Sequence, residues 1–542
     1  MAVVKLDKLA RSVAEGPSLM TGAFPTKDWM EVPAVYKPGN YAYPTKPDIL
    51  SYLDSQQGIS LPNSRDWNPE DDDWKLPENW KDIIIQGISD RLDKFRSLKI
   101  FMDCCVRCGA CADKCHFFLG TGDPKNMPVL RAELLRSVYR QNFTLAGKIL
   151  GKLAGGREMT VGILKEWFMY AYQCTECRRC SVFCPYGIDT AEITMMLREL
   201  LHLLGIGINW AMEPVANSNR TGNHMGLTPQ AFKGNVDFLC EDIENLTGVK
   251  VNPTFNRKGA EVLFITPSAD VFAEPGIFTC MGYLILFEAI GLDYTWSTYA
   301  SEGGNFGLFT NNEVMKKLNG KMYAEAERLG VKWILGGECG HMWRVVHQYM
   351  DTMNGPADFL EIPKSPMTGT VFENAASTKM VHISEFTADL IKHGKLNLDK
   401  SRNSHVKATF HDSCNPARAM GLLDEPRYIM DHVCDWVEMP ENTIREKTYC
   451  CGSGTALNTD EIMELRMRSG LPRANAVKYV RDKHDVNTLT CVCAIDRATL
   501  TTLCDYWVPP VQVAGISELV GNALVLEGEQ RQELDEGLRT LV

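Results

Sequence analysis

The segments HDSCNP (411–416), CCG (450–452) and CVC (491–493) decide how the rest of this chain is interpreted. They place five thiols within eighty residues, and two of the thiols are neighbours. Adjacent cysteines do not meet ordinary disulfide geometry without strain, and one tetrahedral zinc ion takes four ligands, usually as spaced pairs. Soft thiolates favour iron–sulfur clusters, zinc or Cu(I). The pattern predicts an iron–sulfur site of unusual shape, with zinc and unrelated buried cysteines as alternatives.

The composition indicates a multidomain protein with metal sites rather than disulfides. A chain of 542 residues is expected to form about three or four domains, and a net charge of −11 argues against a nucleic-acid surface. Its 19 cysteines are clustered, and the N-terminal residues lack the apolar core of a secretory signal. No apolar run reaches the roughly 18 residues that span a bilayer. We therefore expect a reducing compartment and no transmembrane helix, so that any membrane link comes through a partner.

Two further cysteine runs share one spacing. They read CVRCGACADKCH (105–116) and CTECRRCSVFCP (174–185), and both match C-x2-C-x2-C-x3-C, as in bacterial ferredoxins. The second run ends with Pro185, whereas His116 takes that place in the first; Cys104 is left over and is expected to be a buried thiol. Two cubane [4Fe–4S] clusters are therefore predicted. Because the fourth cysteine of each run crosses to the other cluster in such ferredoxins, the two ligand sets are expected to be Cys105, Cys108, Cys111 and Cys184, and Cys174, Cys177, Cys180 and Cys115.

The residues before the first run form an N-terminal part, 1–97. Its first 80 residues are rich in Pro, Tyr and Trp, including Trp67, Trp74 and Trp80. This stretch is either a surface arm packed on its own protein or an extended arm that wraps a partner subunit, because aromatic residues are frequent interface anchors. Apolar periodicity predicts one amphipathic helix from Asn79 to about Ile100.

Helical patterns flank the ferredoxin-like runs. MPVLRAELLRSVYRQ (127–141) and TAEITMMLRELLHLLG (190–205) carry apolar residues at helical spacing. Cysteine runs that open into helices, with a long helical insert between them, resemble the α-helical ferredoxin domain of respiratory iron–sulfur subunits. Such a domain is predicted over 98–205, followed by a polar connector over 206–258 with one helix from Asn235 to Leu246.

The rest of the chain is predicted to be a duplicated α/β domain, with halves at 259–400 and 401–542. Four apolar segments predict strands, at 260–270, 331–341, 406–416 and 486–495, and helical runs such as 313–329 and 459–468 lie between them. Strands that alternate with helices indicate parallel sheets. Ser268 falls where Cys414 falls, 300–303 falls near the CCG segment, and Cys339 falls where Cys493 falls. The first half would then keep only Cys339 of its cluster cysteines.

The order Cys414, Cys450-Cys451-Gly452 and Cys491-x-Cys493 resembles the CCG domain of heterodisulfide reductases, and the resemblance covers roughly 98–505. The family has C-x-x-C at the last position, so Cys339 or His341 of the degenerate half is a candidate to complete the site. The resemblance implies an oxidoreductase subunit in which a non-cubane [4Fe–4S] cluster reduces a disulfide. It implies the catalytic ligands Cys414, Cys450, Cys451, Cys491 and Cys493.

In detail, HDSCNPARAMGL (411–422) and CCGSGTALN (450–458) are similar to the DsrK family, the iron–sulfur subunits of the sulfite-reduction-associated membrane complex DsrMKJOP. This resemblance implies electron transfer between a haem b and quinone-linked membrane subunit (DsrM-like) and a protein disulfide or trisulfide (DsrC-like). It also implies a peripheral position on the cytoplasmic face of the cell membrane, as part of a complex. The direction of electron flow is left open.

Disulfide cleavage also needs a proton or positive charge at the leaving thiolate. His411, Asp412, Arg418 and His341 are candidates, and a structural hydrogen bond is the alternative for each. A pure electron relay in a respiratory dehydrogenase, a heterodisulfide reductase subunit acting on small thiols, and a zinc-stabilised scaffold remain competing functions. No GxGxxG opens a helix after a strand, so bound NAD or FAD is not expected.

Overall fold

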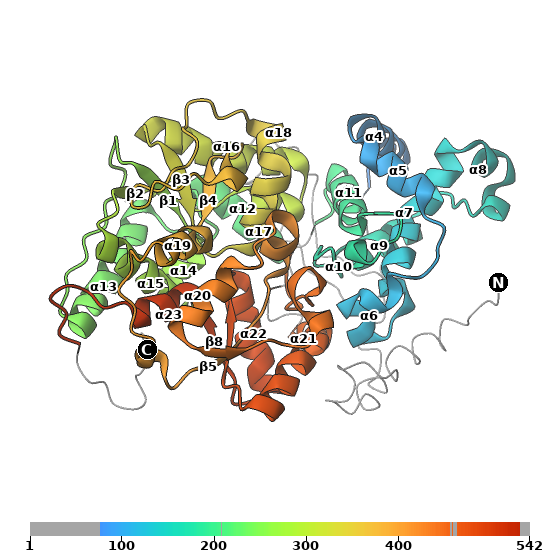
Figure 1. Cartoon of the computed structure of the whole chain (residues 1–542). Helices are drawn as coiled ribbons and strands as arrows, with labels where there is room; N and C mark the ends of the chain where they lie inside the picture. The colour runs from blue at the N-terminus through green and yellow to red at the C-terminus, as the bar shows by residue number, and fades with distance from the viewer. Residues whose placement is uncertain (1–75, 208, 456–457, 459–462, 532–542) are drawn as a thin grey trace. The chain divides into compact units, whose positions relative to one another are not determined.

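The computed structural model describes residues 76–207, 209–455, 458 and 463–531 (Figure 1). Two compact units are present. Unit 1 contains the described residues up to Ala216, together with Phe306–Asn312 and Tyr449–Asn475; unit 2 contains Asn217–Asn305, Glu313–Thr448 and the described residues from Ala476 onwards. Sequence order alone had put 449–475 in the C-terminal half. Most of the Trp-rich arm, including Trp67 and Trp74, lies outside the described residues.

Unit 1 is a helical unit centred on α11 (Thr190–Leu203), which is buried on almost every side. The capping side chain of Asp189 accepts a hydrogen bond from the Ala191 N–H at 3.0 Å and starts this helix. The other elements that surround it are α4 (Trp80–Lys94), α5 (Arg96–Cys104), η2 (Ala112–Lys114), α6 (His116–Thr121), η3 (Pro124–Asn126), α7 (Pro128–Phe143), α8 (Leu145–Leu150), η4 (Gly151–Ala154), α9 (Val161–Ala171) and α10 (Arg179–Val182).

The single helix predicted from Asn79 to Ile100 is wrong, because Phe95 is extended (φ −119°, ψ 94°) and separates α4 from α5. α4 buries Ile88, and α5 buries Leu98 and Met102. Ten residues of continuous helix would turn Leu98 about 80° away from the direction of Ile88. The break at Phe95 lets both apolar faces pack into the same unit.

The predicted connector also holds more structure than expected. Two helices occupy it, α12 (Asn209–Thr221) and α13 (Pro229–Thr247), where the sequence predicted one shorter helix. Thr228 caps α13, because its hydroxyl oxygen accepts a hydrogen bond from the Ala231 N–H at 3.3 Å.

Unit 2 contains two four-stranded parallel sheets with the same strand order, β2-β1-β3-β4 and β6-β5-β7-β8. The four predicted strands are the central pairs of these sheets, whose continuous apolar runs are typical of strands covered on both faces. The edge strands have only three or four residues and were missed. The bounds are β1 (Val262–Ile265), β2 (Tyr294–Trp296), β3 (Trp333–Gly336), β4 (Met380–His382), β5 (Lys407–Phe410), β6 (Asp435–Val437), β7 (Thr488–Cys491) and β8 (Gln512–Gly515).

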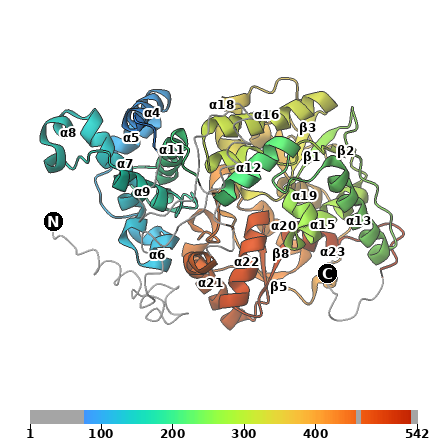
Figure 2. The same ribbon diagram turned by 180° about the vertical axis from the view of Figure 1, so that it is seen from behind.

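Helices cover these sheets, and Figure 2 shows α13 beside α15. α21 runs through Pro472 to His484, well beyond its predicted end at Arg468. No helix in the described ranges has the length and apolar character to cross a bilayer. The helices and turns are α14 (Ser268–Phe272), α15 (Glu274–Ile290), η5 (Gly304–Leu308), α16 (Asn312–Leu329), α17 (Gly340–Val345), η6 (Val346–Met350), α18 (Asp351–Asn354), η7 (Glu373–Ala375), α19 (Ile383–Lys392), η8 (Lys400–Asn403), η9 (Pro416–Met420), α20 (Glu425–Val433), η10 (Glu441–Thr443), η11 (Arg445–Lys447), α21 (Met463–His484), α22 (Ala494–Trp507) and α23 (Ile516–Ala523).

One hydrophobic core serves both sheets, and α15 of the first half packs closely on α23 of the second. Gly282 permits this contact, because a Cβ at that position would lie 2.0 Å from the carbonyl oxygen of Ser517. A larger residue would force the two helices apart.

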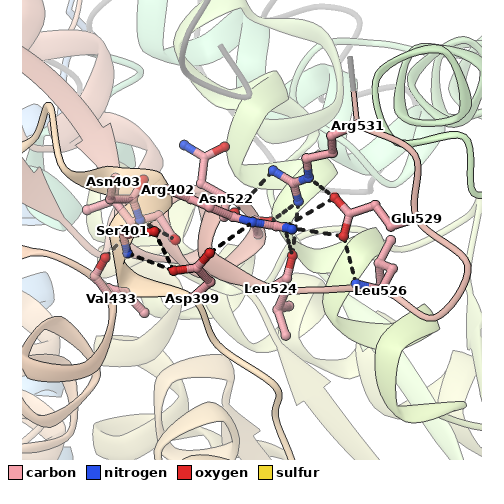
Figure 3. A network of polar contacts seen from close by, with 12 residues as sticks. Asp399, Ser401, Arg402, Asn403, Val433, Asn522, Leu524, Leu526, Glu529 and Arg531 are labelled. Atoms are coloured by element: carbon pink, nitrogen blue, oxygen red, sulfur yellow. Dashed lines mark hydrogen bonds and ion pairs between the residues drawn. The ribbon is translucent and has the colours of Figure 1, made fainter. Parts of the chain in front are cut away.

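Hydrogen bonds from Arg402 and Arg531 hold the C-terminal segment of unit 2 in place (Figure 3). Arg402 donates to the Leu524 carbonyl oxygen at 2.6 Å and to Glu529 at 3.1 Å, and Glu529 also bonds Arg531. Arg531 in turn donates to the Asn522 carbonyl oxygen at 3.1 Å. These bonds satisfy backbone carbonyls at the end of α23.

Candidate iron–sulfur sites

The cysteines of the two ferredoxin-like runs lie in unit 1, and the thiols that act electrostatically on Cys111 and Cys180 come from both runs. The pKa of the Cys111 thiol is raised to about 12, first by burial and in smaller part by the neighbouring thiols of Cys105 and Cys184. Burial also raises the pKa of Cys180, where the thiols of Cys174 and Cys115 are the next largest influences, ahead of Cys111. Each run thus sends its fourth cysteine towards the other run, which is the arrangement that two cubanes require.

The thiols do not form a mononuclear site. Nowhere in the described part of the chain do three His, Cys, Asp or Glu side chains meet closely enough to hold one metal ion. A cubane makes a different demand, because four thiolates surround the cluster and each binds its own iron. Ligation of two cubanes by the eight named cysteines, as two crossed sets, stays a prediction.

Cys104 is exposed, so the expectation that it is a buried thiol is wrong. α5 buries Leu98 and Met102, which lie four residues apart on one face. Cys104 lies two residues beyond Met102, about 200° around the helix, and therefore on the opposite side.

The CCG segment lies in unit 1 and is almost fully buried. The Sγ atoms of Cys450 and Cys451 are 3.9 Å apart, well beyond the S–S bond length of about 2.05 Å, and the Gly452 N–H donates to Cys450 Sγ at 3.4 Å. Gly452 has a φ of +103°, and a Cβ there would lie 2.8 Å from the Gly470 nitrogen. Glycine is therefore required by the backbone angle and by the close approach to α21.

Hydrogen bonds join this CCG segment to the second ferredoxin-like run within unit 1. The Thr455 hydroxyl donates to the Cys174 carbonyl oxygen at 3.0 Å. His116 lies between the two segments: its Nδ1 is 3.0 Å from the Ser469 carbonyl oxygen, and its Nε2 is 2.9 Å from Thr175 Oγ1. The Ser469 hydroxyl then donates to the Gly452 carbonyl oxygen at 2.9 Å.

These contacts make a continuous chain of hydrogen bonds, Thr175–His116–Ser469–Gly452. A carbonyl can only accept, so Nδ1 of His116 carries a proton towards Ser469, and Nε2 can accept from the Thr175 hydroxyl. The sequence analysis noted His116 only as the residue in the place of proline. Its long-range partners were not predictable from the motif.

The remaining thiols of the motif lie in unit 2, at the carboxyl ends of the central strands. Cys414 follows β5, Cys491 ends β7, and Cys493 is the residue before α22; all three are buried. In this sheet β5 is flanked by β6 on one side and β7 on the other, so β5 and β7 border the point where the strand order reverses. Ligands of open parallel sheets bind at such switch points.

Cys339 of the first half lies beside Cys493. The two are equivalent in the fold, because each precedes the helix that follows the third strand of its sheet, α17 or α22. A Cβ at Gly340 would lie 2.9 Å from Cys493 Sγ and 3.5 Å from Pro416, and the Cys339 thiol contributes to the raised pKa of Cys493 after the larger effect of burial. The structure thus brings Cys339 and Cys493 together with the segment after Cys414.

Comparisons with known proteins identify the family of this chain. Residues 101–188 match the 4Fe-4S dicluster domain. The chain is 50% identical over 488 residues to the Hdr-like menaquinol oxidoreductase iron-sulfur subunit of Archaeoglobus profundus, covering 86% of this chain and 88% of that protein. It is 51% identical over 487 residues to iron-sulfur subunit 2 of the Hdr-like menaquinol oxidoreductase of Archaeoglobus fulgidus, covering 86% and 88%.

This chain belongs to the Hdr-like iron–sulfur subunit family. It is therefore an oxidoreductase subunit with iron–sulfur clusters. A more distant relative is a subunit of the dihydromethanophenazine:CoB–CoM heterodisulfide reductase of Methanosarcina mazei, 26% identical over 434 residues, covering 79% of this chain and 95% of that protein.

In this Hdr-like subunit two arginines of α7 approach the ferredoxin-like runs, a feature that the sequence analysis missed. Arg131 is buried, its charge acts on the thiols of Cys174 and Cys115, and it donates to the Gln173 carbonyl oxygen at 3.2 Å. Arg136 donates to the carbonyl oxygens of Met102 and Cys105 at 3.0 and 2.9 Å. Both positive charges favour nearby thiolates. The available signal was two arginines, five residues apart, within an otherwise apolar helix pattern.

The first half of unit 2 holds a hydrogen-bonded cluster of polar side chains at Ser268 and Glu302. Ser268, which begins α14 as Cys414 begins the turn after β5, donates to Glu302 Oε1 at 2.5 Å. His224 Nδ1 lies 2.6 Å from the same carboxylate. Burial acts to lower the pKa of His224, but Glu302 raises it above its usual value. Ser268, His224 and Glu302 therefore satisfy one another's buried polar atoms.

The four candidate proton donors differ in their surroundings. Asp412 accepts two hydrogen bonds from Arg427, at 2.7 and 2.8 Å, and so has a structural role. Arg418 also has a structural role, because it donates a hydrogen bond to the Glu446 carbonyl oxygen at 2.8 Å. His411 is fully buried, and its Nε2 lies 3.4 Å from Asp496 Oδ2.

Asp496 is also the largest electrostatic influence on Cys491, whose pKa is raised first by burial and then by this carboxylate. His411 is therefore linked to the Cys491 thiol through the carboxylate of Asp496. His341, the fourth candidate, is buried in α17 two residues after Cys339.

Proposed function

We propose that this subunit passes electrons between a quinone-linked haem b membrane partner and a disulfide, which is cleaved at a cluster held by Cys414, Cys450, Cys451, Cys491 and Cys493. Two electrons and two protons convert one disulfide into two thiols. The bound cluster would supply a soft iron site at which one substrate sulfur can be stabilised. The relatives include subunits of a menaquinol oxidoreductase and of a heterodisulfide reductase. The first name supports the quinone-linked partner, and the second supports the disulfide substrate.

The observation that carries the proposal is the hydrogen-bonded junction between the CCG segment and the second ferredoxin-like run in unit 1. We infer an order of electron transfer from it. The cubane of Cys174, Cys177, Cys180 and Cys115 would be the immediate partner of the CCG cluster, and the cubane of Cys105, Cys108, Cys111 and Cys184 would be the more remote one. Cys339 is the proposed additional contact where Cys491-x-Cys493 departs from the family spacing.

The finer identity of the partners is part of the same proposal. A DsrK-like subunit would meet a DsrM-like membrane protein and would act on a DsrC-like protein disulfide or trisulfide in dissimilatory sulfur metabolism, on the cytoplasmic face of the membrane. The motif letters at 411–422 and 450–458 support this assignment. A small-thiol heterodisulfide is the other substrate class, since the Methanosarcina heterodisulfide reductase contains a relative of this chain.

The test is disulfide reduction by the purified holoprotein with a reduced viologen as artificial donor, combined with EPR after treatment with oxidant and thiol. Turnover together with a thiol-dependent paramagnetic signal is the expected result. A protein that contains all its clusters but shows neither turnover nor that signal would instead be an electron relay of a respiratory dehydrogenase. The altered Cys491-x-Cys493 spacing is the specific observation that favours this second function.

Chemical analysis of the full chain should find about twelve irons, four for each of three clusters. Replacing Cys184 by Ser is expected to lose the cubane of Cys105, because the fourth cysteine crosses between the runs. The EPR signal of the cubane that contains Cys174 should remain. Loss of only the Cys174 cubane would show that the ligand sets are not crossed.

Replacing His116 by Phe is expected to slow reduction of the CCG cluster by the cubanes, with the iron content unchanged. The variant removes two buried hydrogen bonds at the junction, each worth about 1–3 kcal/mol when a partner is left unsatisfied. Freeze-quench EPR after mixing with dithionite would follow both centres.

A matched control for this variant is His202→Leu in α11. His202 is buried in the same unit, its ring makes no hydrogen bond within the described ranges, and burial lowers its pKa to about 4. The control should transfer electrons at the wild-type rate. Equal rates in wild type, His116→Phe and the control would remove His116 from the electron-transfer junction.

A further inference from the structure

The turn formed by α8 and η4 carries four large aliphatic side chains that the fold does not bury. The exposed fractions are 77% for Leu145, 71% for Ile149, 52% for Leu150 and 90% for Leu153. Leu145, Ile149 and Leu150 belong to α8, and Leu153 follows in η4, which begins at the left-handed-φ residue Gly151. We call these four exposed side chains the aliphatic stripe. Four such residues within nine positions form a contiguous apolar patch, which on a soluble surface marks an interaction site.

Hydrogen bonds within unit 1 hold the α8–η4 turn in place. Thr144 caps α8 by accepting a hydrogen bond from the Gly147 N–H at 3.0 Å. Arg140 at the end of α7 donates to the Gly155 carbonyl oxygen at 3.1 and 2.9 Å and closes the other end. A Cβ at Gly147 would lie 1.8 Å from the Arg140 carbonyl oxygen, so the turn is held close against α7. Both views show α8 at one end of unit 1, beyond α7 (Figures 1 and 2).

The charge around the stripe is positive, although the chain as a whole carries −11. Residues 134–157 contain no acidic residue. Lys148 of α8 and Lys152 of η4 are exposed, alternate in sequence with the aliphatic residues, and form no ion pair among the residues that the structure describes. An apolar stripe flanked by lysines is the pattern of a helix that lies in the surface of an anionic bilayer.

The composition of the patch separates a lipid surface from a protein partner. Cores of protein–protein interfaces are enriched in aromatic residues and Arg and are depleted in Lys. The exposed residues of the α8–η4 turn are aliphatic and Lys, with no aromatic residue among them. Lysines can also extend along an apolar surface and place their ammonium groups among phosphates.

We propose that the α8–η4 turn inserts its aliphatic stripe into the headgroup region of a membrane that contains anionic lipid, with Lys148 and Lys152 bound to lipid phosphates. This inference rests on the proposed function in that the subunit acts beside a membrane partner. It assigns the lipid contact to one turn of unit 1. The N-terminal arm, for which the sequence analysis left open a contact with a partner subunit, lies mostly outside the described residues.

The test is co-sedimentation of the purified, cluster-loaded full chain with vesicles of phosphatidylcholine and phosphatidylglycerol. The wild type is expected to bind these vesicles and to bind pure phosphatidylcholine vesicles much more weakly. The double variant Ile149→Asp, Leu153→Asp should lower the vesicle affinity at least about tenfold, because each buried methylene contributes to insertion. Neutralising both lysines (Lys148→Gln, Lys152→Gln) should lower it about tenfold at low salt and less at high salt.

The matched control is Phe238→Asp in α13 of unit 2. Phe238 is an exposed aromatic residue (59% exposed) that lies outside the α8–η4 turn. This variant should bind vesicles like the wild type. The proposal is overturned if the Ile149→Asp, Leu153→Asp variant keeps wild-type vesicle binding. It is equally overturned if wild type ignores vesicles and the variant loses only its binding to the purified membrane subunit, since the turn is then a protein contact.

Reductase turnover with the artificial donor is measured on the same preparations. The α8–η4 variants should keep the wild-type turnover, because the turn contains none of the proposed cluster ligands. Turnover without any vesicle binding would refute the lipid contact and leave the proposed function standing. Vesicle binding that depends on the α8–η4 turn, without reductase turnover, would support the lipid contact and refute the proposed function.

Discussion

Replacing Cys451 by Ala is expected to abolish disulfide reduction and to leave the EPR signals of both cubanes intact. Cys451 is buried and its thiol lies 3.9 Å from that of Cys450, so the pair offers two separate thiolates to one centre. Removing one takes a ligand from the proposed catalytic cluster and touches none of the eight cysteines of the ferredoxin-like runs. The measurements are viologen-driven turnover, iron content and low-temperature EPR.

Two comparisons make this result specific. Cys434→Ala removes a buried thiol that belongs to no motif and should keep full activity. Cys177→Ala should damage a cubane and block electron delivery, while the CCG cluster still assembles and still responds to thiol. If Cys451→Ala retains full reductase activity, the CCG site is a relay or a structural centre, and the dehydrogenase-subunit function takes its place.

Replacing Arg497 by Met is expected to lower the free energy of unfolding by about 3–5 kcal/mol. Arg497 of α22 is buried between two carboxylates of the first half: it donates to Glu338 at 2.6 Å and also bonds Asp270. The variant would leave both carboxylates buried without their cation. Urea unfolding followed by circular dichroism, with the cluster content checked in parallel, measures the change.

The free energy of unfolding that Arg497→Met loses should depend on pH. Burial raises the pKa of Asp270 and of Glu338, and Arg497 opposes that rise. A buried carboxyl with a raised pKa is tolerated while it is protonated and destabilises the fold as pH rises through its folded-state pKa. The difference between wild type and Arg497→Met should therefore shrink in acid and grow as pH rises.

Arg328→Met is the matched control, because Arg328 pairs with Glu325 on the surface of α16 at 2.7 Å and is 40% exposed. Arg328→Met should lower the free energy of unfolding by no more than about 1 kcal/mol. Adding Asp270→Asn and Glu338→Gln to Arg497→Met should recover part of the lost stability, since the buried charges are then gone. A loss for Arg497→Met no larger than that of the control would refute the role of this ionic cluster.

Local pattern predicted a large part of the fold. The central strands β1, β3, β5 and β7 were found because each is a short apolar run buried on both faces. The edge strands, which have three or four residues, were missed because the apolar segments found in the sequence coincide only with the central strands. The break at Phe95 was missed for a different reason: the apolar residues on either side fit one helix until the orientation of the core is known.

What the sequence by itself determined is the chemistry: two ferredoxin-like runs, a vicinal cysteine pair followed by glycine, and a dicluster domain that the family match bears out. These are short-range properties, since ligand spacing and strand periodicity are written in neighbouring residues. Only the tertiary structure decided that Tyr449–Asn475 belongs with the helical unit and that His116 bonds Ser469, 353 positions away. It alone decided that Arg497 lies between Asp270 and Glu338. These contacts join side chains that are distant in sequence, and they are selected by the burial of polar groups, which no local pattern encodes.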